Sequence, residues 1–171
     1  AIHTTTLHSA MCANMICMSK GIGLSISFVT DQNGIQKFLK SCDRLVWFDY
    51  GVSVSQDTIE RLITSEWNGT VVPCVTDEVD WDQFKKKTLS GSTEPVQQRA
   101  LKFDIEMRSI PKKTDVMEYV SGNARIFSLD SKVVLKKLRD ASADYKSMEQ
   151  LKKMGLKICV LRSAPVTCHY V

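Results

Sequence analysis

A single carboxylate, Asp49, follows an unbroken apolar run that begins at Leu45 and ends at Phe48. Such a run is typical of a strand buried on both faces, as in a parallel sheet covered by helices. Open α/β sheets bind their ligands at the carboxyl ends of the strands, so the position of Asp49 predicts a binding or catalytic role. Asp49 and Gly51 can equally begin a simple turn, and the sequence leaves both interpretations open.

Other residues with chemical potential lie far from this strand along the chain. Residues 121–124 form a predicted small-residue loop. Asp144 interrupts a helical pattern, where it is either a functional acid or a helix cap. His169 lies in an extended segment near the end of the sequence, where it is either functional or an ordinary half-buried histidine.

Two more carboxylates, Asp104 and Glu106, lie in a stretch whose structure is ambiguous, residues 96–107. If this stretch is a strand, the two side chains share one face and could form a paired-carboxylate site. Alternating charges more often mark the solvent face of a strand, so this interpretation competes with a structural one.

The elements that must position these residues alternate between helical and strand patterns in the first half of the chain. The predicted order is a helix over 4–19, a strand over 23–30, a helix over 35–41, the strand from 43, a helix from 55 and a strand over 70–76. Ser55 is the expected N-cap of its helix, and Pro73 places the last strand near an edge or a bulge. This alternation predicts a mainly parallel, Rossmann-like sheet with helices on both faces.

The second half is less regular. The sequence predicts a short helix over 79–85, strands over 116–120 and 156–161, an apolar segment over 126–129, helices after Asp130 and over 145–154, and an extended segment over 166–170. Only residues 1–3 precede the first helix, so the first strand of a parallel domain is expected to be missing.

Composition sets the remaining limits. The 171 residues, 43% of them hydrophobic, suit one domain, 1–171. The net charge of +4 comes without a long basic block, so nucleic acid is not an expected partner. No apolar stretch has membrane-spanning length, and the six cysteines include no C-x-x-C pair. Reduced thiols and a cytoplasmic location are therefore expected.

The order of these signals resembles the nucleotide-sugar glycosyltransferases of the GT-A fold. Residues 45–52 look like the strand of that family that ends in an Asp-x-Asp motif, and residues 121–129 resemble its small-residue stretch. Asp144 is similar in position to the acidic catalytic-base motif. Residues 153–160 resemble the helix, glycine and strand that precede the last metal ligand, and His169 corresponds to that histidine.

The resemblance implies a GT-A-like fold and a metal-dependent transfer of a sugar from a nucleotide-diphosphate donor to a hydroxyl acceptor. Asp49 and His169 would bind Mn²⁺ or Mg²⁺, and Asp144 would be the base. The residues expected at the nucleotide sugar are Tyr50, Gly51, Ser121, Gly122 and Asn123. Asp49 and His169 must then lie at one cleft.

The chain departs from the family pattern at Gly51, which stands where the second acid of Asp-x-Asp would be, and at Asp144, which lacks a second carboxylate beside it. The alternative prediction is therefore a catalytically degenerate relative that is a structural or interaction subunit with a protein partner. Short proteins of this kind occur in large DNA viruses and phages, so the host cytoplasm or the virion is the expected location if the source is viral.

Overall fold

The computed structural model describes residues 4–27, 32–49, 51–137, 147–162 and 166–168. Its α-helices are α1 (Thr4–Ser19), α2 (Gln32–Ser41), α3 (Gln56–Ile63), α4 (Trp81–Leu89), α5 (Ser131–Lys137) and α6 (Met148–Lys153). Its strands are β1 (Arg44–Phe48), β2 (Val52–Val54), β3 (Gly69–Val72), β4 (Val75–Val79), β5 (Leu101–Phe103), β6 (Ile105–Ser109), β7 (Val116–Gly122), β8 (Ile126–Asp130), β9 (Ile158–Leu161) and β10 (Val166–Cys168). A short 3₁₀ helix spans Val96–Gln98.

Six strands form one sheet in the order β1-β8-β3-β9-β7-β6, and β3 with β9 is its parallel pair. The neighbouring pairs β1–β8, β3–β8, β7–β9 and β6–β7 are antiparallel. The fold is therefore mixed α/β, and the prediction of a mainly parallel sheet was wrong. β8 lies between β1 and β3 and runs antiparallel to both of them. β6 and β7 form a hairpin, and the short connection of a hairpin requires antiparallel pairing.

Helices cover two faces of this sheet. Ile35 of α2, Val134 of α5 and Leu151 of α6 pack in one buried cluster with sheet residues such as Phe127. Ile16 of α1 and Ile59 of α3 pack in a second cluster, which includes Ile126. Neighbouring residues of β8 thus point to opposite faces, as the strand repeat requires.

Two sequence predictions fail near the start of the chain. Of the strand expected over 23–30, residues 23–27 form neither helix nor strand, the side chains of Leu24 and Ile26 are exposed, and residues 28–30 lie outside the described residues. β1 is half-buried throughout instead of buried on both faces, because it is the terminal strand of the sheet order and pairs only with β8 in the described ranges.

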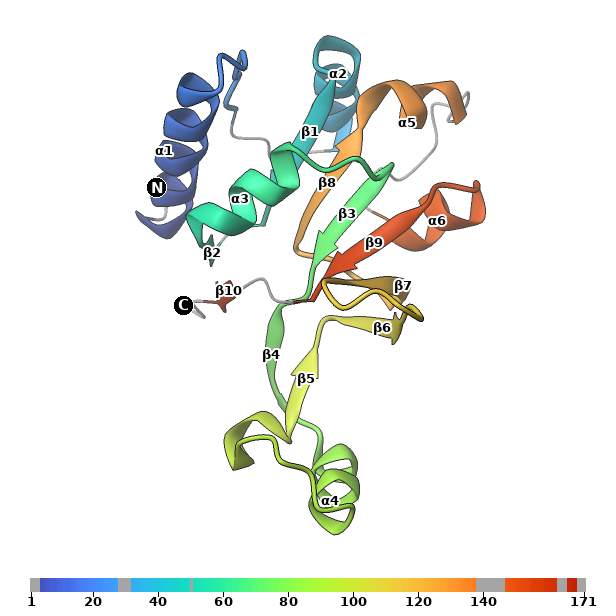
Figure 1. The fold of residues 1–171 in the computed structure, drawn as a ribbon. Helices are drawn as coiled ribbons and strands as arrows, with labels where there is room; N and C mark the ends of the chain where they lie inside the picture. The colour runs from blue at the N-terminus through green and yellow to red at the C-terminus, as the bar shows by residue number, and fades with distance from the viewer. Residues whose placement is uncertain (1–3, 28–31, 50, 138–146, 163–165, 169–171) are drawn as a thin grey trace.

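The single strand predicted over 70–76 is divided at Pro73, which lies between β3 and β4. Because proline has no N–H to donate, the ladder of β3 ends there, and β4 pairs with β5 in a separate two-stranded sheet. Figure 1 shows β4, β5 and α4 extending away from the six-stranded sheet. This change of sheet leaves the corner at Cys74 beside the carboxyl end of β3.

Candidate functional site

The carboxyl ends of β1 and β3 lie on either side of the first residue of β8. Ile126 pairs with Phe48 of β1 and with Val72 of β3. Asp49 and Cys74 follow those two strands closely, and Arg125 precedes β8. The edge predicted from the apolar run before Asp49 therefore exists, although it is built around an antiparallel strand.

Asp49 is held at this edge by two contacts. Its backbone N–H donates to the carbonyl oxygen of Arg125 at 2.9 Å. The indole Nε1 of Trp47 donates to Asp49 Oδ1 at 2.6 Å. A carboxylate that ligates a metal is commonly oriented by such a second hydrogen bond, so the indole gives Asp49 the support that a ligand needs.

Gly51 stands where the resemblance would place the second acid of Asp-x-Asp. The residue is buried and has a φ of 74°, in the left-handed region where side chains other than glycine are strained. An aspartate at position 51 would carry that backbone strain. The backbone at this position therefore favours glycine over a second metal ligand.

Asp104, between β5 and β6, connects segments at the same edge. Its Oδ1 accepts from the backbone N–H of Cys74 at 2.9 Å, and its Oδ2 accepts from that of Arg125 at 3.3 Å. Its own N–H donates to the Cys74 carbonyl at 2.9 Å, and its carbonyl accepts from the N–H of Asn123 at 3.2 Å. Burial raises the pKa of Asp104, and the hydrogen bonds from Cys74 and Arg125 offset only part of this rise.

The paired-carboxylate prediction for Asp104 and Glu106 does not describe their contacts. Asp104 accepts from backbone groups, whereas Oε2 of the exposed Glu106 accepts from the Ser121 hydroxyl at 2.7 Å. Asp104 is thus a site residue whose actual role the sequence did not reveal. The local signal was a carboxylate between two apolar residues, Phe103 and Ile105, in a stretch where charged and apolar residues alternate.

Ser121 and Gly122 belong to the end of β7, so the prediction that both lie in a loop was wrong, and Asn123 follows the strand. The Tyr119 hydroxyl donates to the Gly122 carbonyl at 2.6 Å, and the Gly122 N–H donates to Glu149 Oε1 at 3.2 Å. Burial, with the nearby charges of Glu149 and Asp104, raises the pKa of Tyr119 to about 12. Through Asn123 and Arg125, this segment is tied to Asp104 and so to the edge that carries Asp49.

The end of the chain returns to the same region through a small antiparallel sheet. β10 pairs with β2 so that Cys168 lies opposite Val52 and Val166 lies opposite Val54. Because the strands are antiparallel, β10 runs toward the Gly51 end of β2. This pairing joins the two segments whose sequence neighbours are Asp49 and His169.

Three predicted site residues, Tyr50, Asp144 and His169, lie outside the described residues. In the described ranges, no group of three or more His, Cys, Asp or Glu side chains could share a metal ion. Asp49 supplies one oriented carboxylate oxygen, a ligand of the type that Mn²⁺ and Mg²⁺ accept, and so fits part of a metal site.

The helices in those ranges are too short or too polar to cross a membrane.

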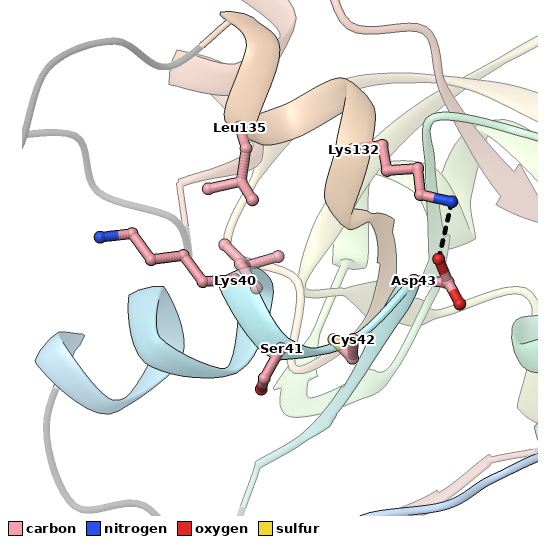
Figure 2. Close-up of a pocket in the computed structure, with 7 residues that line it drawn as sticks. Lys40, Ser41, Cys42, Asp43, Lys132 and Leu135 are labelled. Carbon is pink, nitrogen blue, oxygen red and sulfur yellow. Dashed lines mark ion pairs between the residues drawn. The ribbon is translucent and has the colours of Figure 1, made fainter.

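A separate open pocket of about 260 Å³ lies at the other end of β1, between the end of α2 and the start of α5. In Figure 2 its rim carries the ion pair of Lys132 Nζ with Asp43 Oδ1, at 2.8 Å. Both side chains are more than four-fifths exposed, and none of the predicted site residues lines the pocket. The pocket therefore does not belong to the Asp49 edge.

The chain matches no family model, no curated protein and no solved structure. The resemblance to nucleotide-sugar glycosyltransferases therefore stays a prediction that depends on the residues described above.

Proposed function

We propose that this protein binds a nucleotide-diphosphate sugar together with Mn²⁺ or Mg²⁺ and transfers the sugar to a hydroxyl acceptor. The observation that carries the proposal is the pairing of β10 with β2. Cys168, which precedes His169, lies opposite Val52, which follows Gly51. A shared ligand set from Asp49 and His169 requires these two segments to lie side by side.

Each predicted site residue has a separate role in this proposal. The carboxylate of Asp49, oriented by the indole of Trp47, ligates the cation. The cation, when bound, neutralises charge on the diphosphate leaving group. The segment from Ser121 to Asn123, which hydrogen bonds to Tyr119 and Asp104, would contact the donor. Asp144, by resemblance, accepts the proton of the acceptor hydroxyl.

The test is titration of the protein with nucleotide sugars by calorimetry, with Mn²⁺ and in excess EDTA. Saturation at 100 times the Kd would also stabilise the fold by about 2.7 kcal/mol, which a thermal shift detects. We expect Mn²⁺-dependent binding that Asp49→Asn abolishes. Asp43→Asn is the matched control, because Asp43 is an exposed carboxylate at the opposite end of β1. Equal binding by the two variants, or no binding by the wild type, would reject the proposal.

One observation favours the alternative, an interaction subunit without catalysis. Met11, Met15 and Met18 lie on one face of α1 and are 59%, 64% and 74% exposed. Methionine surfaces adapt well to protein partners. Under this alternative the protein binds no nucleotide sugar, and replacing the three methionines with lysine abolishes an association seen by analytical ultracentrifugation. Nucleotide-sugar binding that the triple variant retains would instead favour the transferase.

A further inference from the structure

One carboxylate at the candidate site contacts protein backbone on two separate segments. Asp104 accepts from Cys74 at the β3–β4 corner and from Arg125 at the start of β8, with one carboxylate oxygen for each N–H. The Arg125 carbonyl in turn accepts from the N–H of Asp49. One residue therefore links the Asp49 segment to the end of β3 through a continuous chain of hydrogen bonds.

We propose that Asp104 is a proton-controlled positioning residue, whose ionised carboxylate holds Arg125 and Cys74 in place and thereby sets the position of Asp49 for ligand binding. Protonation removes one acceptor, because the carboxyl oxygen that carries the proton becomes a donor facing an N–H. The link to either Arg125 or Cys74 then weakens, and the site loses its fixed geometry. The ligand-binding part of this inference rests on the proposed function.

The burial of Asp104 determines whether its protonation raises or lowers the stability of the fold. Burial raises the pKa of Asp104 above its ordinary value, so the folded protein binds this proton more tightly than the unfolded chain does. The contribution of Asp104 to the free energy of unfolding is therefore fully present below the ordinary pKa of an aspartate. It is lost as the pH rises through the raised pKa.

The geometry of the candidate site depends on pH in the direction opposite to that of the free energy of unfolding. The ionised form supplies both acceptors, so ligand affinity rises with pH over the range in which stability from the same group falls. A carboxylate with a purely structural role would not couple these two changes with opposite signs.

Two titratable side chains act on or respond to Asp104: the Cys74 thiol, whose hydrogen bond offsets part of the rise that burial causes in the pKa of Asp104, and the Tyr119 phenol. Arg125 contributes its backbone N–H. Tyr119 of β7 and Glu149 of α6 lie close enough for their charges to interact with one another, and Asp104 also acts on Tyr119. The raised pKa of Tyr119, about 12, keeps that phenol neutral where Asp104 titrates. Glu149 is unchanged in the wild type and in both variants used below, so it does not distinguish them.

The chain offers a matched pair of variants. Asp104→Asn keeps the shape of the side chain but replaces one acceptor oxygen with an N–H₂ group that cannot accept. Glu106→Gln changes a carboxylate two residues away whose partner is the Ser121 hydroxyl. A hydrogen bond to a charged group contributes enough that Asp104→Asn is expected to weaken binding of the Mn²⁺–nucleotide sugar by about tenfold at pH 7.5.

The experiment measures binding and thermal unfolding of the wild type and both variants between pH 4 and pH 8. We expect the affinity ratio of wild type to Asp104→Asn to fall toward one as the pH decreases, while the stability of the wild type relative to this variant increases. Glu106→Gln should follow the wild type in affinity at every pH. An affinity ratio that does not change with pH, or the same loss in Glu106→Gln, would overturn the proposal.

A measurement on the wild type alone separates this inference from the proposed function and does not depend on the folding of a variant. In NMR spectra, the amide protons of Cys74 and Arg125 should shift together with one midpoint above the ordinary aspartate range. The amide of Asn123, which donates to the backbone carbonyl of Asp104, is the internal reference. Amides of Cys74 and Arg125 that do not titrate refute the role of Asp104 whether or not a ligand binds. Titrating amides with no ligand binding refute only the proposed function.

Discussion

Gly122 offers the sharpest test of the site's geometry, because a single added carbon would collide with backbone. Its φ is +109°, and a Cβ at this position would lie 2.4 Å from the carbonyl oxygen of Asp104 and 2.7 Å from Cα of Ile105. Both atoms belong to the main chain, so neither can move aside by a side-chain rotation. Gly122→Ala must therefore displace either the end of β7 or the Asp104 segment.

The expected loss combines two terms. A strained backbone conformation costs about 1–3 kcal/mol, and forcing an extra carbon into a packed site costs about 1–3 kcal/mol more. The free energy of unfolding should therefore fall by roughly 2–6 kcal/mol. For a chain of this size, each kcal/mol lowers Tm by about 2–4 °C, so a decrease of at least about 4 °C is expected.

Urea unfolding followed by tryptophan fluorescence measures the free energy, and two other glycines are its controls. Gly91 has a φ of +69° and open space where a Cβ would lie, so Gly91→Ala reports the backbone strain alone, about 1–2 kcal/mol. Gly23 has open space and an ordinary φ, so Gly23→Ala should change stability by less than about 0.5 kcal/mol. If Gly122→Ala loses no more stability than Gly91→Ala, the close approach to Asp104 does not constrain the fold and the reasoning is wrong.

Three further predictions concern single contacts. Trp47→Phe removes the indole donor to Asp49 and should weaken Mn²⁺-dependent donor binding about tenfold or more in calorimetry, whereas unchanged affinity would exclude this support. Tyr119→Phe removes the hydrogen bond to the Gly122 carbonyl and should lower the free energy of unfolding by about 1 kcal/mol. Because the folded pKa of Tyr119 is raised from 10.0 to about 12, the wild type should also lose stability between pH 10 and 12, and Tyr119→Phe should lose less over that range. Ser55→Ala removes the N-cap of α3 and should cost about 1 kcal/mol in urea unfolding, and an unchanged midpoint would contradict the cap.

Local signals in the sequence predicted local structure well. The helix expected over residues 4–19 is α1, and Ser55 accepts from the N–H of Thr58 as an N-cap should. The sequence did not show which face of α1 is buried: Ala13 and Ile16 are buried, whereas Met11 and Met15 are exposed. Apolar residues occur on all sides of this helix, so the periodicity of its sequence could not show which side packs on α3.

Strand order could not be predicted from the same signals. The sequence revealed most of the strand segments but not which neighbours they take, because pairing depends on contacts between distant parts of the chain. The position of β8 between β1 and β3 illustrates the limit, since its paired residues, from Val72↔Ile126 to Arg44↔Asp130, are 54 to 86 residues apart. An alternating helix–strand pattern favours a parallel sheet, and a single inserted antiparallel strand changes two pairings at once.

The two carboxylates at the carboxyl edge show why only part of the site was predictable. Asp49 follows an apolar run, so a local pattern identified it. Asp104 contacts backbone groups 30 and 21 residues away, and backbone N–H groups are the same in every sequence. The environments of the two acids also differ, because an indole orients Asp49 at the edge whereas Asp104 is desolvated between segments. In the proposed site an accessible acid ligates the cation and a desolvated acid holds the backbone, and the sequence pattern indicated the role of Asp49 but not that of Asp104.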